Sequence, residues 1–497
     1  MLLHMTSDLD FRSFLDSHFN LLSIQSKKRF SSKKYKCALH KMKKLALDPI
    51  RDIVFPLYSQ MGRPANDPAV YFRSFILMQH FDYTSIDRWV ETAANDEVLM
   101  FLMGTSHVPS VSCHYDFISR VMHDHPSLDE LSVAGLFKKK NKNFLKLKRN
   151  EKYVNYTEND VRQLRQRYRN GASADSGRMI FTIQSIFNAL AVVPSIKMGL
   201  IDPDGTFCGD GSAQHISANE NGHRVIDSDD PSALTTRYTA TGADKGWDSD
   251  LGQWYYGFTE YNISQHNSHS GIDLPVFLTL EAASRHDALT SISATAQMLD
   301  MNKNIHPKYM CFDSASDSTE MCEFLLNDRN IIPVIDLNRR SKGMFTDNAD
   351  SKRDYTINEN GVPVCREGFE MTFDGYNPGR KRIKYRCPLK CSRKNGRHIE
   401  SCPVGNCSKS PYGRVVYIPT KDNLRFFGPV PHGSDKFKSI YKDRTCTERI
   451  NDRILNDYHL YKMGVRNMAK NAFFLIMAGI NIHLDAWIRK DGSCQQA

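Results

Sequence analysis

The chain has 497 residues, of which 40% are hydrophobic and 25% charged, values typical of a globular protein with two to four domains. No apolar run reaches the ~18 residues needed to cross a bilayer, and the first residues lack the basic start and cleavage site of a signal peptide. We therefore expect a cytoplasmic protein without membrane contact, whose 12 cysteines stay reduced and, where clustered, bind metal.

Positive charge is unevenly distributed along the chain. The net charge is +10, yet nine lysines and arginines and no acid lie between Lys27 and Lys44. Twelve basic residues against three acids lie between Lys138 and Arg169. Such blocks favour a polyanionic partner. The alternative is that they form solvated faces or linkers without a partner.

Residues 1–135 are predicted to form a helical domain. Apolar residues at helical spacing follow Asp67–Pro68, Thr84 or Ser85, and Ser110, and a further helical segment stops at Gly104. Several short helices with tight connections are compatible with a helix-turn-helix domain that binds DNA. The alternative is a helical bundle used for dimerisation.

An α/β core is predicted after a basic segment. Residues 136–175 have little apolar periodicity and are expected to be an exposed linker or an arm that follows DNA. Within 176–340, an apolar helix is followed by three strands, a helix, a strand, a helix and a strand. That order is typical of an RNase H-like core.

Residues 341–440 break this regularity and are predicted to be a Cys-rich insertion, before helices resume over 441–497. Two cysteine pairs lie in it, Cys387 with Cys391 and Cys402 with Cys407. Their spacing suits tetrahedral thiolate coordination of a structural Zn²⁺, with Cys365 and His398 as replacement ligands. The alternative is a set of reduced cysteines in a poorly packed insertion.

Two aspartates end apolar strands of the predicted core: Asp210 in FCGDGSAQH and Asp313 in YMCFDSASD. If the strands are neighbours, both carboxylates lie at one crevice of the sheet. Carboxylates suit Mg²⁺, and two such ions can activate the attacking oxygen and stabilise the leaving one in phosphoryl displacement. Taken alone, an aspartate at a strand end is more often a turn or cap residue.

Other carboxylates compete for this role. Asp202 and Asp204 suit a turn before the first strand, and Asp287 suits the cap of the next helix. Asp336 ends a further strand and is a reserve ligand candidate.

The segment from about residue 210 to 487 resembles the catalytic core of bacterial insertion-sequence DDE transposases. The similar runs are GDGS, GWDSDLGQWYYGFTEY, LPVFLTLEAASRHD, CFDSASDS, IIPVIDLN and YKDRTCTERIN. The last is the most specific, because it resembles the Y-R-E part of the signature in the Y-R-E-K branch. It falls on Tyr441, Arg444 and Glu448.

The resemblance implies roles for these residues. Glu448 would complete a metal site with Asp210 and Asp313, and the nearby Tyr441 and Arg444 would contact DNA phosphate. The N-terminal runs RPANDPAVYFRSF and VPSVSCHYDF also resemble segments that precede the core in this group.

The chain departs from the signature at its last member. Leu455 lies seven residues after Glu448, where that branch carries lysine. Arg449 or Arg453 are the candidates to supply the missing DNA contact.

The leading hypothesis is therefore an insertion-sequence transposase. Its helical domain and basic segments, including Lys138, Lys139 and Lys140, would bind the double-stranded terminal inverted repeats. The core would use Mg²⁺ or Mn²⁺ to hydrolyse DNA at the element end and join the freed 3′-hydroxyl to target DNA. The resemblance implies a homodimer or higher multimer on DNA at the nucleoid. The alternatives are a catalytically silent DNA-binding regulator and a metal-dependent nuclease.

Overall fold

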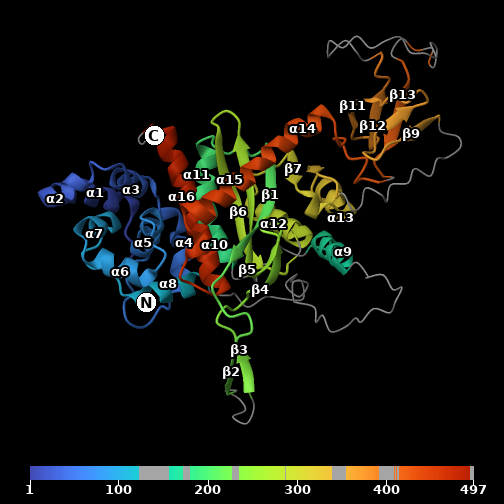
Figure 1. Cartoon of the computed structure of the whole chain (residues 1–497). Coiled ribbons are helices and arrows are strands. Elements are labelled where there is room, and N and C mark those ends of the chain that lie inside the picture. The colour runs from blue at the N-terminus through green and yellow to red at the C-terminus, as the bar shows by residue number, and fades with distance from the viewer. Residues whose placement is uncertain are drawn as a thin grey trace.

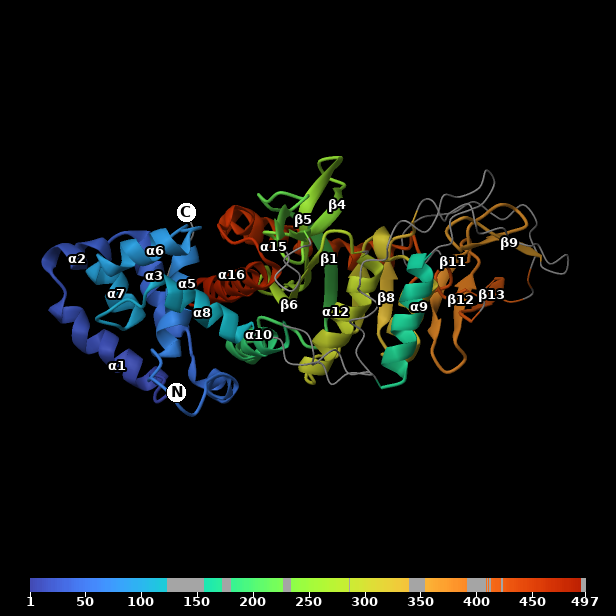
Figure 2. The ribbon, with the colours of Figure 1, turned by 90° about the horizontal axis from the view of Figure 1, so that it is seen from below.

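The computed structural model describes residues 1–122, 156–171, 180–226, 234–285, 287–338, 354–390, 408, 410, 413–421 and 423–492. Figure 1 shows an N-terminal helical region, a central α/β region and small β-sheets at the far end. Figure 2, from a perpendicular direction, shows the same three regions in a row. The chain is therefore a mixed α/β protein with a helical N-terminal region.

Short helices, most of them with side-chain caps, build the N-terminal region. They are α1 (Asp8–His18), α2 (Ile24–Arg29), α3 (Lys33–Lys44), α4 (Arg51–Val54), α5 (Pro68–His80), α6 (Ile86–Ala94), α7 (Glu97–Met103) and α8 (Val111–Val121). The side chains of Asp67, Ser85 and Ser110 accept backbone N–H groups at the starts of α5, α6 and α8. These bonds satisfy donors that a helix start leaves free. The predicted helices are confirmed, with Ser85 as the cap of α6.

The helix α16 (Met468–Lys490) joins this region to the rest of the protein. Phe75 of α5 packs edge-on against Phe473, and the buried Lys41 of α3 donates to Asn481 at 2.9 Å and pairs with Asp485 at 2.8 Å. By length and composition α16 could cross a membrane, but 94% of its apolar window is buried inside the protein. It is therefore a core helix, and one continuous core unites the helical region with the central sheet.

The predicted basic linker is helical where the structure describes it. The helix α9 (Tyr156–Arg169) buries Val161 and Leu164 and packs against α12 (Asp287–Met301) and α13 (Thr319–Glu323). An exposed linker over 136–175 is therefore not what this part of the segment forms. The basic pattern of this segment predicted exposure, but its arginines are neutralised by acids more than 150 residues later in the chain.

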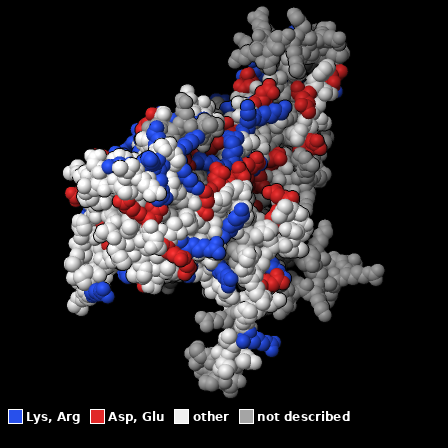
Figure 3. All heavy atoms as spheres, turned by 60° about the vertical axis from the view of Figure 1, so that its left-hand side comes forward, with Lys and Arg blue, Asp and Glu red and all other residues white. Residues whose placement is uncertain are grey.

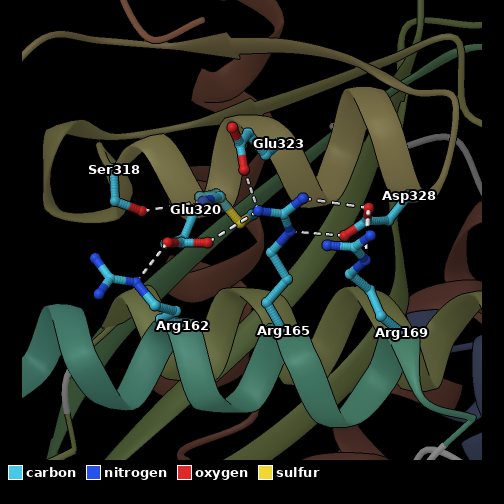
Figure 4. Close-up of polar contacts among 8 residues, drawn as sticks. Arg162, Arg165, Arg169, Ser318, Glu320, Glu323 and Asp328 are labelled. Carbon is cyan, nitrogen blue, oxygen red and sulfur yellow. Dashed lines mark hydrogen bonds and ion pairs between the residues drawn. The ribbon is translucent and has the colours of Figure 1, made fainter. Parts of the chain in front are cut away.

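Figure 4 shows these ion pairs, which we call the α9 cluster. Arg162 pairs with Glu320, Arg165 with Glu320, Glu323 and Asp328, and Arg169 with Asp328. The cluster fixes α9 on the connection between β7 (Tyr309–Phe312) and β8 (Ile332–Ile335).

A six-stranded mixed sheet forms the centre of the molecule. In sheet order its strands are β4 (Asp244–Asp248), β5 (Gln253–Asn267), β1 (Thr206–His215), β7 (Tyr309–Phe312) and β8 (Ile332–Ile335), with β6 (Ile272–Ala282) also paired to β5. β5 runs antiparallel to β1 and β6, whereas β7 runs parallel to β1 and β8. The carboxyl ends of β1, β7 and β8 therefore lie at one edge. A ribbon of β2 (His223–Ile226) and β3 (Leu234–Arg237) precedes β4.

Helices cover both faces of the sheet. Adjacent residues of a strand point to opposite faces. Asn262 of β5 bonds to Asn451 of α15 (Thr445–Asp452), whereas its neighbour Tyr261 lies beside Ser291 of α12. Hence α15 and α12 cover opposite faces. Helix α16, with α10 (Ile180–Phe187), packs on β6, and α11 (Val193–Lys197) follows α10 after a π-helical turn.

The predicted insertion contains two small sheets. One pairs β9 (Tyr355–Ile357) with β10 (Pro363–Cys365), and the other has the order β11 (Thr372–Asn377), β12 (Arg382–Arg386) and β13 (Val415–Pro419). A separate core that includes Ile383 and Tyr385 supports them.

Both ends of the insertion are held by Asp317, which follows β7. Arg425 donates to the buried Asp317 at 2.6 and 2.5 Å, and the same carboxylate accepts the Asn338 N–H at 2.7 Å. Helix α14 (Asp435–Tyr441) then leads back to the sheet.

Candidate active site

Three aspartates follow equivalent positions of neighbouring parallel strands. The ladders pair residue 209 with 312, and 312 with 335. The next residues are Asp210, Asp313 and Asp336, so they form a row across the carboxyl edge of the sheet. The sequence predicted the first two as neighbours and held the third in reserve.

A layer of cysteines connects this row to α15. Cys208, Cys311 and Cys446 each lie two positions before one of the three predicted carboxylates, and all three are buried in one cluster. The contact with Cys311 and burial raise the pKa of the Cys208 thiol well above its usual value, and Cys446 also contacts this thiol. These contacts bring β1, β7 and α15 together directly beside the predicted carboxylates.

The Arg444 guanidinium bridges two of those carboxylates. Its Nη1 donates to Asp210 Oδ2 at 2.9 Å, and its Nη2 donates to Glu448 Oε1 at 2.6 Å. The Thr447 hydroxyl donates to the same Asp210 oxygen at 3.3 Å. Asp210 and Glu448, which are far apart in the chain, therefore share the guanidinium of Arg444.

Burial makes negative charge costly at this site. It raises the pKa of Asp210 to about 6; Arg444 opposes the rise, and the charges of Asp313 and Glu448 add to it. On β5, burial raises the pKa of Glu260 to about 8, and the charge of Asp210 contributes. A cation would relieve this repulsion, which is common at functional sites.

The donor set fits a divalent cation, because Mg²⁺ and Mn²⁺ prefer carboxylate oxygens. Among the described residues, however, no three His, Cys, Asp or Glu side chains lie close enough to hold one ion. Glu448 contacts Arg444 instead. The negative charges of the carboxylates suit a divalent cation, while the Arg444 guanidinium occupies the Glu448 carboxylate.

A buried amide network holds α15 against the sheet. Asn262 Nδ2 donates to Asn451 Oδ1 at 2.5 Å, and the Ser264 hydroxyl donates to Asn262 Oδ1 at 2.5 Å. Asn451 lies three residues after Glu448, so this network fixes the helix turn that presents the third carboxylate.

Asp287, which the sequence assigned to a helix cap, lies at this site. It is the first residue of α12. Burial raises its pKa to about 7, and the charges of Asp313 and Asp210 contribute to this rise. No local pattern distinguishes it from an ordinary residue of a first helical turn, so the sequence did not predict its position at this site.

The glycines that flank Asp210 show how closely other side chains pack against this strand. A Cβ on Gly209 would lie 2.5 Å from Phe312 Cε1 and 2.8 Å from Tyr261 Oη. A Cβ on Gly211 would lie 3.4 Å from Asp287 Oδ1. Gly209 therefore leaves room for Phe312 and Tyr261 beside Asp210, and Asp287 lies at ordinary contact distance from Gly211.

The predicted DNA-contact residues lie on or near α15. Tyr441 ends α14, stacks on Phe437 with ring centroids 5.3 Å apart, and has its ring centroid 5.7 Å from the Arg444 guanidinium carbon. Burial raises the pKa of Tyr441, and Asp336 and Asp313 are among the charges that add to the rise. Tyr441 and Arg444 therefore both lie beside the strand-end aspartates.

Both candidates for the contact of the absent lysine are held by internal acids. Arg449 donates to Asp273 of β6 at 2.5 and 2.9 Å, and Arg453 donates to Asp485 at 2.8 Å. Leu455 packs against the main core. A DNA contact by either arginine would require it to exchange its carboxylate for phosphate.

Some predicted residues lie outside the described part of the chain. They are Lys138, Lys139 and Lys140 and three of the predicted zinc ligands, Cys391, Cys402 and Cys407. The fourth, Cys387, is a partly buried free thiol. The zinc site stays a prediction.

Comparison with known families concerns the helical region. Residues 26–123 match the family described as "Transposase domain (DUF772)", a stretch that begins in α2 and includes α3 to α8. No curated protein matches the chain. The match covers less than half of the chain and lies outside the strand-end carboxylates. It supports a transposase-type function for this protein.

Proposed function

We propose that the protein is a DDE transposase with an RNase H-like core, in which Asp210, Asp313 and Glu448 hold Mg²⁺ or Mn²⁺. The observation that carries the proposal is the Arg444 bridge, which joins Asp210 to Glu448 beside the strand end that bears Asp313. The strand order, with three antiparallel strands followed by two parallel ones, supports the core assignment. The transposase-domain match supports the choice of reaction.

The chain's own residues prepare the site for a phosphodiester. When bound, the divalent cations would activate the attacking oxygen and stabilise the leaving oxygen. Arg444 neutralises Asp210 and Glu448 in the absence of substrate. Released from Glu448, its planar guanidinium suits a bidentate contact with DNA phosphate. Tyr441 flanks it and limits where it can move.

The surface charge is compatible with DNA. On the face shown in Figure 3, acidic side chains gather near the middle, and lysines and arginines lie on both sides. An acidic centre suits divalent cations, and basic flanks suit the phosphates of a duplex that crosses it. We propose that double-stranded DNA is the partner, bound by a homodimer or higher multimer.

Strand cleavage and transfer test the proposal. Purified protein would be mixed with labelled duplex carrying the inverted repeats that bracket the gene, a target plasmid, and MgCl₂ or EDTA. We expect metal-dependent nicking at the element end and joining to the plasmid. Asp313→Asn should abolish both, while Asp204→Asn, from the exposed turn before β1, should retain them.

Each other outcome identifies an alternative function. Cleavage without joining would indicate a nuclease. DNA binding by both wild type and Asp313→Asn, with no cleavage by either, would indicate a silent regulator. Equal cleavage by wild type and Asp313→Asn would contradict the carboxylate site.

A further inference from the structure

Asp287 and Tyr261 lie at the site on the side opposite α15. Tyr261 is 1% exposed, and its hydroxyl makes no hydrogen bond of ordinary geometry with the residues that the structure describes, although Ser291 is near. The charges of Asp287, Asp210 and Asp313 all act on this hydroxyl. This buried hydroxyl lies against β1 beside Asp210, since a Cβ on Gly209 would be 2.8 Å from it.

The surroundings of Asp287 differ from those of Glu448. Arg444 contacts Glu448 and Asp210. Among the residues that the structure describes, the charges that shift the pKa of Asp287 are those of Asp313 and Asp210, which are both negative. Gathering like charges in a buried place destabilises a protein unless a cation compensates them.

We propose that Asp287 is a fourth cation-binding carboxylate of this site, with Tyr261 as the positioning hydroxyl beside it. This inference rests on the proposed function, because it concerns the same divalent cation. Asp287 and Asp313 would bind from the α12 side, whereas Glu448 approaches from the α15 side. The geometry places the Asp287 carboxylate next to the residue that follows Asp210, since a Cβ on Gly211 would lie 3.4 Å from Asp287 Oδ1.

A capping role for Asp287 predicts a different behaviour. Asp287 begins α12, and an acid in a first helical turn stabilises the helix dipole. If that were its role, replacing it would lower stability equally with and without metal. A cation-binding role predicts effects of opposite sign: the metal-free protein gains stability, and the metal-induced gain shrinks.

The test measures Mn²⁺ binding and thermal stability without turnover. Protein freed of metal with EDTA and dialysed would be titrated with MnCl₂, with free Mn²⁺ followed by electron paramagnetic resonance and Tm measured at each end point. We expect Asp287→Asn to bind Mn²⁺ at least about tenfold more weakly than wild type. Its metal-free Tm should be higher than that of wild type, and its rise in Tm on adding MnCl₂ smaller.

Matched variants keep the result interpretable. Asp300→Asn, near the other end of α12, where Asp300 pairs with Lys303 at 3.5 Å, should bind Mn²⁺ like wild type. Asp287→Ser retains a residue type that suits a helix start, so a loss of binding shared with Asp287→Asn reports the carboxylate. Circular dichroism should give both variants the helix content of wild type.

The outcomes separate this inference from the proposed function. If Asp210→Asn loses Mn²⁺ binding and Asp287→Asn does not, Asp287 is a capping residue and the proposed function stands. If wild-type protein binds no Mn²⁺, the proposed function fails first and the inference with it. A lower metal-free Tm in Asp287→Asn with unchanged Mn²⁺ affinity would also overturn the inference.

Discussion

Two groups of acidic side chains in this protein are treated in opposite ways. In the α9 cluster three acids lie beside three arginines (Figure 4). Burial lowers the pKa of Arg165, but hydrogen bonds with Asp328 and Glu320 outweigh it, and the net shift is upward. At the candidate active site, the pKa of Asp210 on β1 is raised to about 6, and that of Asp287 at the start of α12 is raised to about 7. The first group is compensated internally, whereas the second leaves negative charge that an external cation would neutralise.

The comparison explains why acidic side chains stabilise the fold in one place and favour cation binding in the other. A compensated cluster gains stability from its ion pairs and binds one helix to another. At the strand-end site Arg444 compensates only part of the negative charge, which costs stability and favours binding of a cation, as expected where function opposes stability. The predictions below test each half of this contrast.

The largest expected effect on stability is at Arg165. Its side chain is 9% exposed and contacts Glu320, Glu323 and Asp328. Arg165→Ala leaves the partly buried Glu320 and Asp328 without their main cation and should lower the free energy of unfolding by about 3 kcal/mol, measured by urea denaturation. The Arg169 side chain is 59% exposed and lies 3.7 Å from Asp328, so Arg169→Ala should lower the free energy of unfolding by less than about 1 kcal/mol. Equal losses in the two variants would contradict a buried, compensated cluster.

The strand-end site should make the stability of the protein depend on pH. Asp210 has a pKa of about 6 when folded against 3.8 as the unperturbed value. The folded state therefore binds more protons between these values, and this group makes the protein less stable as pH rises from about 4 to about 7. In EDTA, Asp210→Asn should reduce that loss by about 2 kcal/mol. Urea denaturation at each pH measures the difference, and identical pH profiles would count against a costly buried charge.

The glycines beside Asp210 should differ in their tolerance of a methyl group. Gly209→Ala places a Cβ within 2.5 Å of Phe312 and 2.8 Å of Tyr261, and should cost about 1–3 kcal/mol. Gly211→Ala has 3.1 Å to Thr259 and should cost less. Thermal unfolding checks the order. If Gly211→Ala were the more harmful change, the packing described around Asp210 would be wrong.

The smallest expected effect on stability is at Arg449. Its side chain is 48% exposed and paired with Asp273. Arg449→Ala should change the free energy of unfolding by less than about 1 kcal/mol. If Arg449 replaces the signature lysine, the variant should bind labelled duplex DNA more weakly and with a shallower salt dependence. Lys421→Ala, a substitution in the insertion, is the charge-matched comparison, and equal loss in both variants would indicate non-specific attraction only.

Much of the local structure could be predicted from the sequence alone. The caps at Asp67, Ser85 and Ser110 and the strands that end near Asp210 and Asp313 depend on residue type and spacing within a few positions. Short-range hydrogen bonding and alternation decide such elements, and both can be read directly from the sequence.

The tertiary structure decided which charges meet. The arginines of α9 look like those of an exposed linker until Glu320, Glu323 and Asp328 are brought against them. Asp287 looks like a helix start until the parallel strands bring Asp313 beside it. Electrostatic environment depends on distance and burial rather than on order along the chain. The sequence therefore determined the elements, and only their packing determined which carboxylates are neutralised and which remain available to a cation.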